Sequence, residues 1–163
     1  MDRKIKKHIR ICSIILVCIV ISIICYIGIF YIQTLNVIDK YLDLRFNYSF
    51  NNDLYEQFNE RYSLFTDEYL SNHEKYDIID TIYNNQLNGK LKQYKIVAVD
   101  HSHGKVFYKV TTDFITIDAK NNTIENTYNL AFEFSPFSII NVKLHSVEPI
   151  NDNTHTHNDE HVH

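Results

Sequence analysis

Glycine and cysteine are scarce in this chain of 163 residues, and their positions exclude several kinds of site. Only two of the three glycines, Gly89 and Gly104, lie beyond residue 32, so there is no glycine-rich phosphate loop. The sequence also lacks His-Glu-x-x-His, Gly-x-Ser-x-Gly and Cys-x-x-Cys motifs. We therefore expect a protein that is not an enzyme.

The three cysteines all lie near the N-terminus, at Cys12, Cys18 and Cys25. The remaining chain therefore cannot form an internal disulfide, although a domain of its size can bury about two-thirds of its unfolded surface without one. We expect the thiols to be small apolar packing residues, with palmitoylation or metal binding as the alternative.

An uncharged apolar run extends from Ile11 to Ile32. As a helix rising about 1.5 Å per residue, it is long enough to cross a hydrocarbon core of about 30 Å. Residues 1–10 form a basic tail with one acid, Asp2, whereas the first charges after the run are balanced. The positive-inside rule then predicts a single-pass protein of the cell membrane, with residues 1–10 in the cytoplasm and residues 33–163 outside.

A cleaved leader is the alternative explanation of this run. Cleavage favours an Ala-x-Ala-like pattern, and the first alanine of the chain is Ala98. A lipoprotein is also disfavoured because the cysteines follow Ile11, Val17 and Ile24 instead of small residues. We expect an uncleaved signal anchor over 11–32.

The charge of the remaining chain limits its partners. Beyond Ile32 there are 11 basic and 19 acidic residues, a net charge of −8 with histidine neutral. Such a surface repels phosphate backbones, so we expect no nucleic-acid partner.

Helical periodicity covers residues 37–88 of an outer domain that we place at 33–149. Apolar residues recur every three or four positions from Val37 to Asn51, and the membrane helix can continue into this segment as a stalk. Asn51–Asp53 is a candidate N-cap for a second helix. A third begins at a capping box, Ser71–Glu74, and ends at Asn88-Gly89. The apolar faces expected for these last two helices are Leu54, Phe58, Tyr62, Phe65 and Tyr69, and Ile79, Ile82, Tyr83 and Leu87.

A period of two follows, over residues 90–148, and predicts antiparallel strands joined by short turns. The predicted strands are Leu91–Asp100, Lys105–Asp118, Asn122–Phe134 and Phe137–Glu148, with Pro149 closing the fold. The inward residues expected on three of them are Tyr94, Ile96 and Ala98; Ile124, Tyr128, Leu130, Phe132 and Phe134; and Ile140, Val142 and Leu144. The lysine-rich first strand suits a sheet edge.

The predicted fold class is α+β, with helices packed on a curved four-stranded antiparallel sheet. This order of elements resembles the cystatin-like roll of the nuclear transport factor 2-like superfamily. With the anchor in front, the layout is similar to the single-pass scaffold subunits of type IV secretion and conjugation machines. The resemblance implies a small extracytoplasmic domain held at the membrane by one helix, and it transfers no functional residue.

Histidines supply the candidate metal site. His155, His157, His161 and His163 lie in a polar segment, 150–163, that we expect to be disordered. Pairs spaced by one residue can reach one ion, and imidazole suits zinc, copper or nickel. Weak binding is expected because ordering a flexible chelator costs entropy. A polar tail that only maintains solubility is the alternative.

Four other residues are candidates for a chemical role. His101 and His103 repeat the same spacing around Ser102 in a predicted turn, and His73 lies in the capping box. Asp113 is the one carboxylate that we consider as a catalytic acid within a sheet cup; a solvent-facing strand residue is the alternative.

Two functional hypotheses remain. The first is a membrane-anchored interaction or scaffold subunit of a bacterial envelope assembly, of the conjugation or type IV secretion kind, with other envelope proteins or its own copies as partners. The second is an exported domain that responds to metal or pH through its histidine tail.

Overall fold

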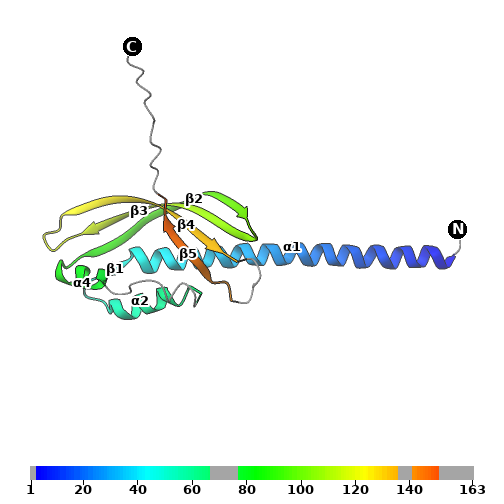
Figure 1. The fold of residues 1–163 in the computed structure, drawn as a ribbon, viewed down its shortest axis with the longest axis horizontal. Helices are drawn as coiled ribbons and strands as arrows, with labels where there is room; N and C mark the ends of the chain where they lie inside the picture. The colour runs from blue at the N-terminus through cyan, green and yellow to red at the C-terminus, as the bar shows by residue number, and fades with distance from the viewer. Residues whose placement is uncertain (1–2, 67–76, 136–140, 151–163) are drawn as a thin grey trace, which may run out of the picture.

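The computed structural model describes residues 3–66, 77–135 and 141–150 and shows an α+β molecule built on one long helix (Figure 1). Helix α1, Arg3–Phe46, is 44 residues long. Its first part, residues 3–29, is called the shaft, and most of it projects away from the rest of the molecule. Its last part lies beneath a curved sheet and, with the rest of the chain, forms the head. The predicted α+β class is confirmed.

The head begins where α1 acquires a buried stripe. Shaft residues such as Ile14 and Ile24 are both 63% exposed, whereas Phe30 is 4% exposed. The stripe then recurs at helical spacing; its buried members are Phe30, Thr34, Ile38, Tyr41, Leu42 and Phe46. The apolar run and the predicted stalk are thus one unbroken helix, and the stalk is also the central core helix of the head.

Helix α1 ends at Phe46, earlier than the predicted Asn51. The reason lies in Asn47, whose side-chain amide donates to Asp43 Oδ1 and whose Oδ1 accepts the backbone N–H of Leu91 at 2.6 Å. This contact turns the chain into a two-residue strand, β1 (Tyr48–Ser49), which pairs with Asn88 and Gly89.

Two short helices follow in the described part of the chain. Helix α2, Leu54–Tyr62, begins as predicted at Asp53, whose carboxylate accepts the backbone N–H of Glu56 at 3.0 Å. Helix α4, Asp77–Asn84, ends before the predicted Asn88-Gly89, because that pair opens a strand. A small second core joins the two helices through Leu54, Phe58, Ile79 and Ile82. Tyr69 and the predicted capping box, with His73, lie outside the described residues.

The sheet is an antiparallel meander in the order β1-β2-β3-β4-β5. The longer strands are β2 (Asn88–Ser102), β3 (Lys105–Ile117), β4 (Thr123–Phe134) and β5 (Leu144–Pro149). Four of these five strands were predicted. Strand β5 starts later than the predicted Phe137, at Leu144, where the chain is held by hydrogen bonds to Leu64 and Thr66. Ile140 lies outside the described residues.

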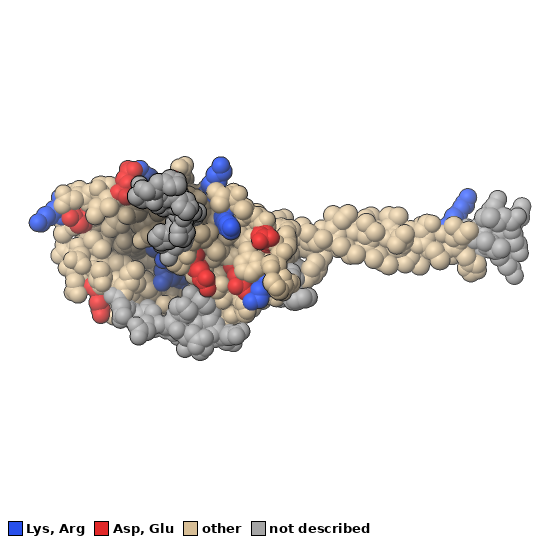
Figure 2. Space-filling model, turned by 45° about the horizontal axis from the view of Figure 1, so that its top comes forward, with Lys and Arg blue, Asp and Glu red and all other residues tan. Residues whose placement is uncertain are grey.

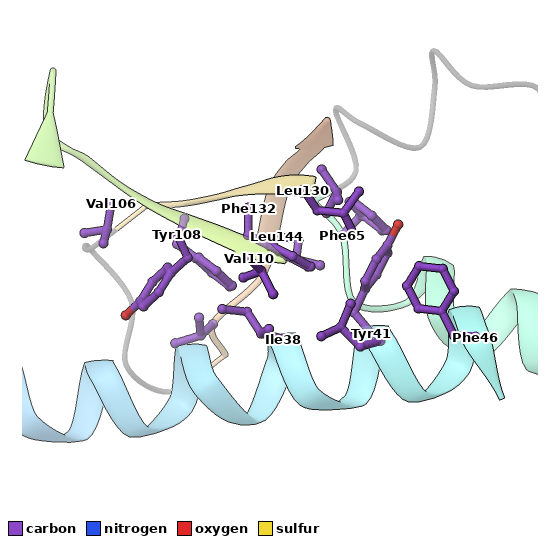
Figure 3. Close-up of a cluster of buried hydrophobic side chains, with 14 of the residues drawn as sticks. Ile38, Tyr41, Phe46, Phe65, Val106, Tyr108, Val110, Leu130, Phe132 and Leu144 are labelled. Atoms are coloured by element: carbon purple, nitrogen blue, oxygen red, sulfur yellow. The ribbon is translucent and has the colours of Figure 1, made fainter. Parts of the chain in front are cut away.

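The main core fills the space between α1 and the concave face of the sheet (Figure 3). Phe65 joins it from the loop after α2, through a bridge to Leu144, and not from the helix face predicted for it. The predicted alternation of β4 is correct from Leu130 onward, but Ile124 and Tyr128 are 58% and 46% exposed because the hairpin extends beyond α1.

The side chains of strand β2 change the face of the sheet to which they point along the length of the strand. A bulge between Ile96 and Ala98 shifts the register, so Ala98, predicted inward with Tyr94 and Ile96, is exposed. Only the first two residues of β2 pair with β1. Within the described residues, the rest of β2 therefore forms an open edge, as expected for a lysine-rich strand.

Candidate functional site

Asp113 lies on the convex face of β3, away from the cup. Its carboxylate accepts hydrogen bonds from Gln93 Nε2 at 2.9 Å and from Thr127 Oγ1 at 2.7 Å. These donors hold the pKa of Asp113 below its ordinary value. Asp113 therefore lies on the outer face of the sheet, and not within the cup where a catalytic acid was considered.

The histidines do not form a metal centre within the described residues. There, no group of three or more histidine, cysteine or acidic side chains is close enough to hold an ion. His101 Nε2 lies 2.8 Å from Tyr31 Oη, and His103 Nδ1 lies 2.7 Å from Ser102 Oγ, so the two rings have different partners. His155, His157, His161 and His163 lie outside the described residues, and the tail site stays a prediction.

His101 belongs instead to a contact that we call the junction: Tyr31, Thr34, His101 and Tyr108. Here the β2–β3 turn meets α1 at the start of the head (Figure 1). Thr34 Oγ1 donates to the carbonyl of Tyr31 at 2.8 Å and lies 2.7 Å from Tyr108 Oη. Because the threonine hydroxyl has one proton, Tyr108 donates to Thr34. Burial raises the pKa of Tyr108, so it remains a donor at neutral pH.

A mostly apolar pocket of about 390 Å³ adjoins the junction. Ile27 and Phe30 of α1 form one side, and Ser102, Gly104 and Val106 of the hairpin form the other. The pocket therefore lies where the exposed apolar shaft enters the head.

A second pocket, which we call the distal pocket, lies between the end of α1, helices α2 and α4, and the sheet. Its volume is about 320 Å³, and Arg45 and Arg61 both line it. Arg45 donates to Tyr41 Oη at 2.5 Å. The Arg61 guanidinium stacks on Phe58, with Cζ 4.1 Å from the ring centre. Sequence reasoning missed this site, although these are the only arginines after residue 10.

Charged groups are distributed unevenly along the molecule. On the face shown in Figure 2, charges of both signs lie on the head, and the shaft carries none between its N-terminal end and the head. Within the described residues, α1 is the one helix long and apolar enough to cross a membrane.

The structure is similar to a solved protein domain, although comparison with families and curated proteins finds no match. No protein-family model and no curated protein matches the chain. A solved structure, the periplasmic domain of DotI (crystal form I), matches with a TM-score of 0.52 over 72% of this chain and 92% of that domain. The chain has the fold of the DotI periplasmic domain. At 12% identity, the likeness concerns the fold alone. Assignment to the nuclear transport factor 2-like superfamily stays a prediction.

Proposed function

We propose that this protein is a membrane-anchored, extracytoplasmic interaction subunit of an envelope assembly of the type IV secretion class, without enzymatic activity. The observation that carries the proposal is that α1 is both a helix able to span a membrane and the core helix of the head. A domain joined to its anchor without a linker has a fixed position at the membrane surface. This suits a scaffold that holds partners in register.

The fold supports the same proposal. DotI is a type IV secretion inner-membrane component, and its periplasmic domain shares this fold. Fold alone is weak evidence for function, because one fold hosts many activities. The evidence from the fold is stronger here because this chain combines the fold with an N-terminal apolar helix.

The open edge of β2 supplies a candidate contact surface. Val97, at the bulge, is 54% exposed, and Val99 is 44% exposed. An unpaired strand edge can accept a strand from another protein.

Photo-crosslinking in native membranes tests the proposal. A crosslinking amino acid at Val97 should yield adducts with other envelope proteins, and the same group at the exposed Lys120 in the β3–β4 turn serves as the control. Mass spectrometry identifies the adducts. Recovery of free monomer alone from both positions would contradict a scaffold role.

Orientation is tested separately. In a variant without Cys12, Cys18 and Cys25, a single Lys120→Cys substitution should react with an impermeant maleimide in intact cells. A Lys7→Cys substitution should react only after lysis. The reverse result would place the head in the cytoplasm and overturn the proposed topology.

A further inference from the structure

The distal pocket contains two cations that have no anionic partner among the described residues. The ion pairs of the described residues are Lys40–Glu60, Lys92–Glu125 and Lys105–Glu133, and none of them includes an arginine. The groups that act on the pKa of Arg61 are Tyr41, Arg45 and Tyr62, together with burial, which lowers it most. No carboxylate is among them.

Holding two arginines in one half-buried pocket without an anionic partner among the described residues is costly. A charge removed from water needs a partner, and two like charges disfavour each other. Stacking recovers part of this cost: Arg61 Cζ lies 4.1 Å from the Phe58 ring centre, and Arg45 Cζ lies 5.5 Å from that of Phe46. Among the 19 acidic residues beyond Ile32, those in the described part do not neutralise this pair, and Asp67, Glu68 and Glu74 lie outside the described residues. An anion that enters the pocket would neutralise the two arginines.

The stacking also leaves hydrogen-bond donors available. An aromatic ring contacts the flat face of a guanidinium, whereas its N–H groups point outward in the plane. Arg45 gives one N–H to Tyr41, and Arg61 hydrogen-bonds Tyr62. A guanidinium has five N–H donors, so each arginine keeps others for a carboxylate, which arginine binds with paired hydrogen bonds.

The lining indicates what carries the anion. Apolar side chains such as Ile82, Leu87 and Phe114 form much of the wall, and Thr116 and Asn126 add polar atoms. A volume of about 320 Å³ fits a side chain or a small molecule. A mostly apolar wall favours a singly charged carboxylate on an apolar body over a phosphate, whose larger charge costs more to desolvate.

We infer that the distal pocket binds a carboxylate carried on an apolar group, supplied by an acidic side chain of a partner protein. The carboxylate site stands on the two arginines and the pocket. Its assignment to a protein partner rests on the proposed function.

The first experiment tests the chemistry, with the full-length protein in lipid nanodiscs. The probe is indole-3-propionate, whose fluorescence is easily followed because the chain contains no tryptophan. We expect saturable binding that Arg61→Gln or Arg45→Gln each weakens at least tenfold and that Arg61→Lys weakens less. The uncharged indole-3-propionamide should bind at least tenfold more weakly than the acid.

Lys109→Gln is the matched control, because Lys109 is an exposed cation on the convex face of β3 and should leave binding unchanged. Circular dichroism verifies that each variant is folded. Equal binding of acid and amide, no effect of either arginine substitution, or displacement by inorganic phosphate at lower concentration than by propionate would overturn the carboxylate site.

The second experiment tests the source of the carboxylate. Tyr128 lines the pocket and is 46% exposed, so a benzoylphenylalanine there keeps an aromatic ring at the rim. In native membranes it should capture a protein, and Arg61→Gln should abolish that adduct. Probe binding without such an adduct would overturn the protein source. If the pocket adduct is absent but adducts at Val97 persist in Arg61→Gln, the assignment of the pocket to a protein partner fails and the scaffold proposal stands.

Discussion

At the scale of single residues, two neighbouring threonines on β3 have opposite surroundings. Thr112 is fully buried, and its Oγ1 has no hydrogen-bond partner within the described part of the chain. Thr111 Oγ1 donates to Asn129 Oδ1 at 2.8 Å. A buried unpaired hydroxyl costs free energy, whereas a paired one contributes about 1 kcal/mol.

We therefore expect Thr112→Val to raise the free energy of unfolding by about 1 kcal/mol, because valine has nearly the same shape without the hydroxyl. Thr111→Val should lower it by about 1 kcal/mol. Urea unfolding of both variants in detergent, followed by circular dichroism, measures the difference. Destabilisation by both substitutions would mean that Thr112 has a partner.

Gly89 is required by close packing. A Cβ added there would lie 2.3 Å from Tyr48 Cε1 and 2.5 Å from the Phe46 carbonyl oxygen, and the latter belongs to the backbone and cannot easily move. Gly89→Ala should cost roughly 1–3 kcal/mol, as overpacking does. Gly28→Ala is the control, since its added Cβ would meet no atom within 4 Å apart from its chain neighbours and the backbone of its own helix. A thermal melt comparing the two checks this, and equal melting temperatures would refute the packing argument.

At the scale of elements, segments with a clear period or a helix cap could be predicted, and a short strand with neither could not. The four longer strands and the continuous α1 follow from alternating or helical patterns of many residues. Strand β1 has two residues and no period, and its position depends on the remote contact between Asn47 and Leu91. The distal pocket was missed for a similar reason: Arg45 and Arg61 lie on different helices, and only the fold brings them together.

The β3–β4 turn depends on one carboxylate. Asp118 Oδ1 accepts the backbone N–H groups of Lys120 and Asn122, and Oδ2 accepts from the Asn122 side chain, which lowers the pKa of Asp118 below its ordinary value of 3.8. A lowered pKa means that the ionised form stabilises the turn. That stabilisation is complete at neutral pH and is lost as the pH falls below 3.8 through the folded-state pKa.

Hydrogen exchange measures this effect directly. Asp118→Ala should speed exchange of the Lys120 and Asn122 amides at pH 7, and the wild-type turn should approach the variant's behaviour at low pH, after correction for intrinsic exchange rates. Amides in the middle of β3 serve as the internal control. Equal protection of the turn in both proteins would contradict the role of Asp118.

At the scale of the whole molecule, the direct joining of shaft and head is the dominant feature. Inserting one alanine between Gly28 and Ile29 rotates the shaft by about 100° relative to the head and lengthens it by about 1.5 Å. The core stripe starts at Phe30 and is not interrupted, so the melting temperature of the head should stay unchanged. Crosslinking from Val97 should fall, because the head faces a new direction. Unchanged crosslinking would mean that shaft and head work independently.

In the topology proposed above, with the head outside the membrane, the same direct joining constrains how the protein is made. Helix α1 is synthesised before the residues that cover its stripe, which run from Val106 on β3 to Val147 on β5 and are therefore exported later. Until then, Phe30, Ile38 and Leu42 stand uncovered beside the bilayer. The head therefore completes its folding only after nearly the whole chain has crossed. A chain arrested before β4 displays an apolar stripe at the outer surface, a clear mark by which an export chaperone or protease can distinguish unfinished copies from finished ones.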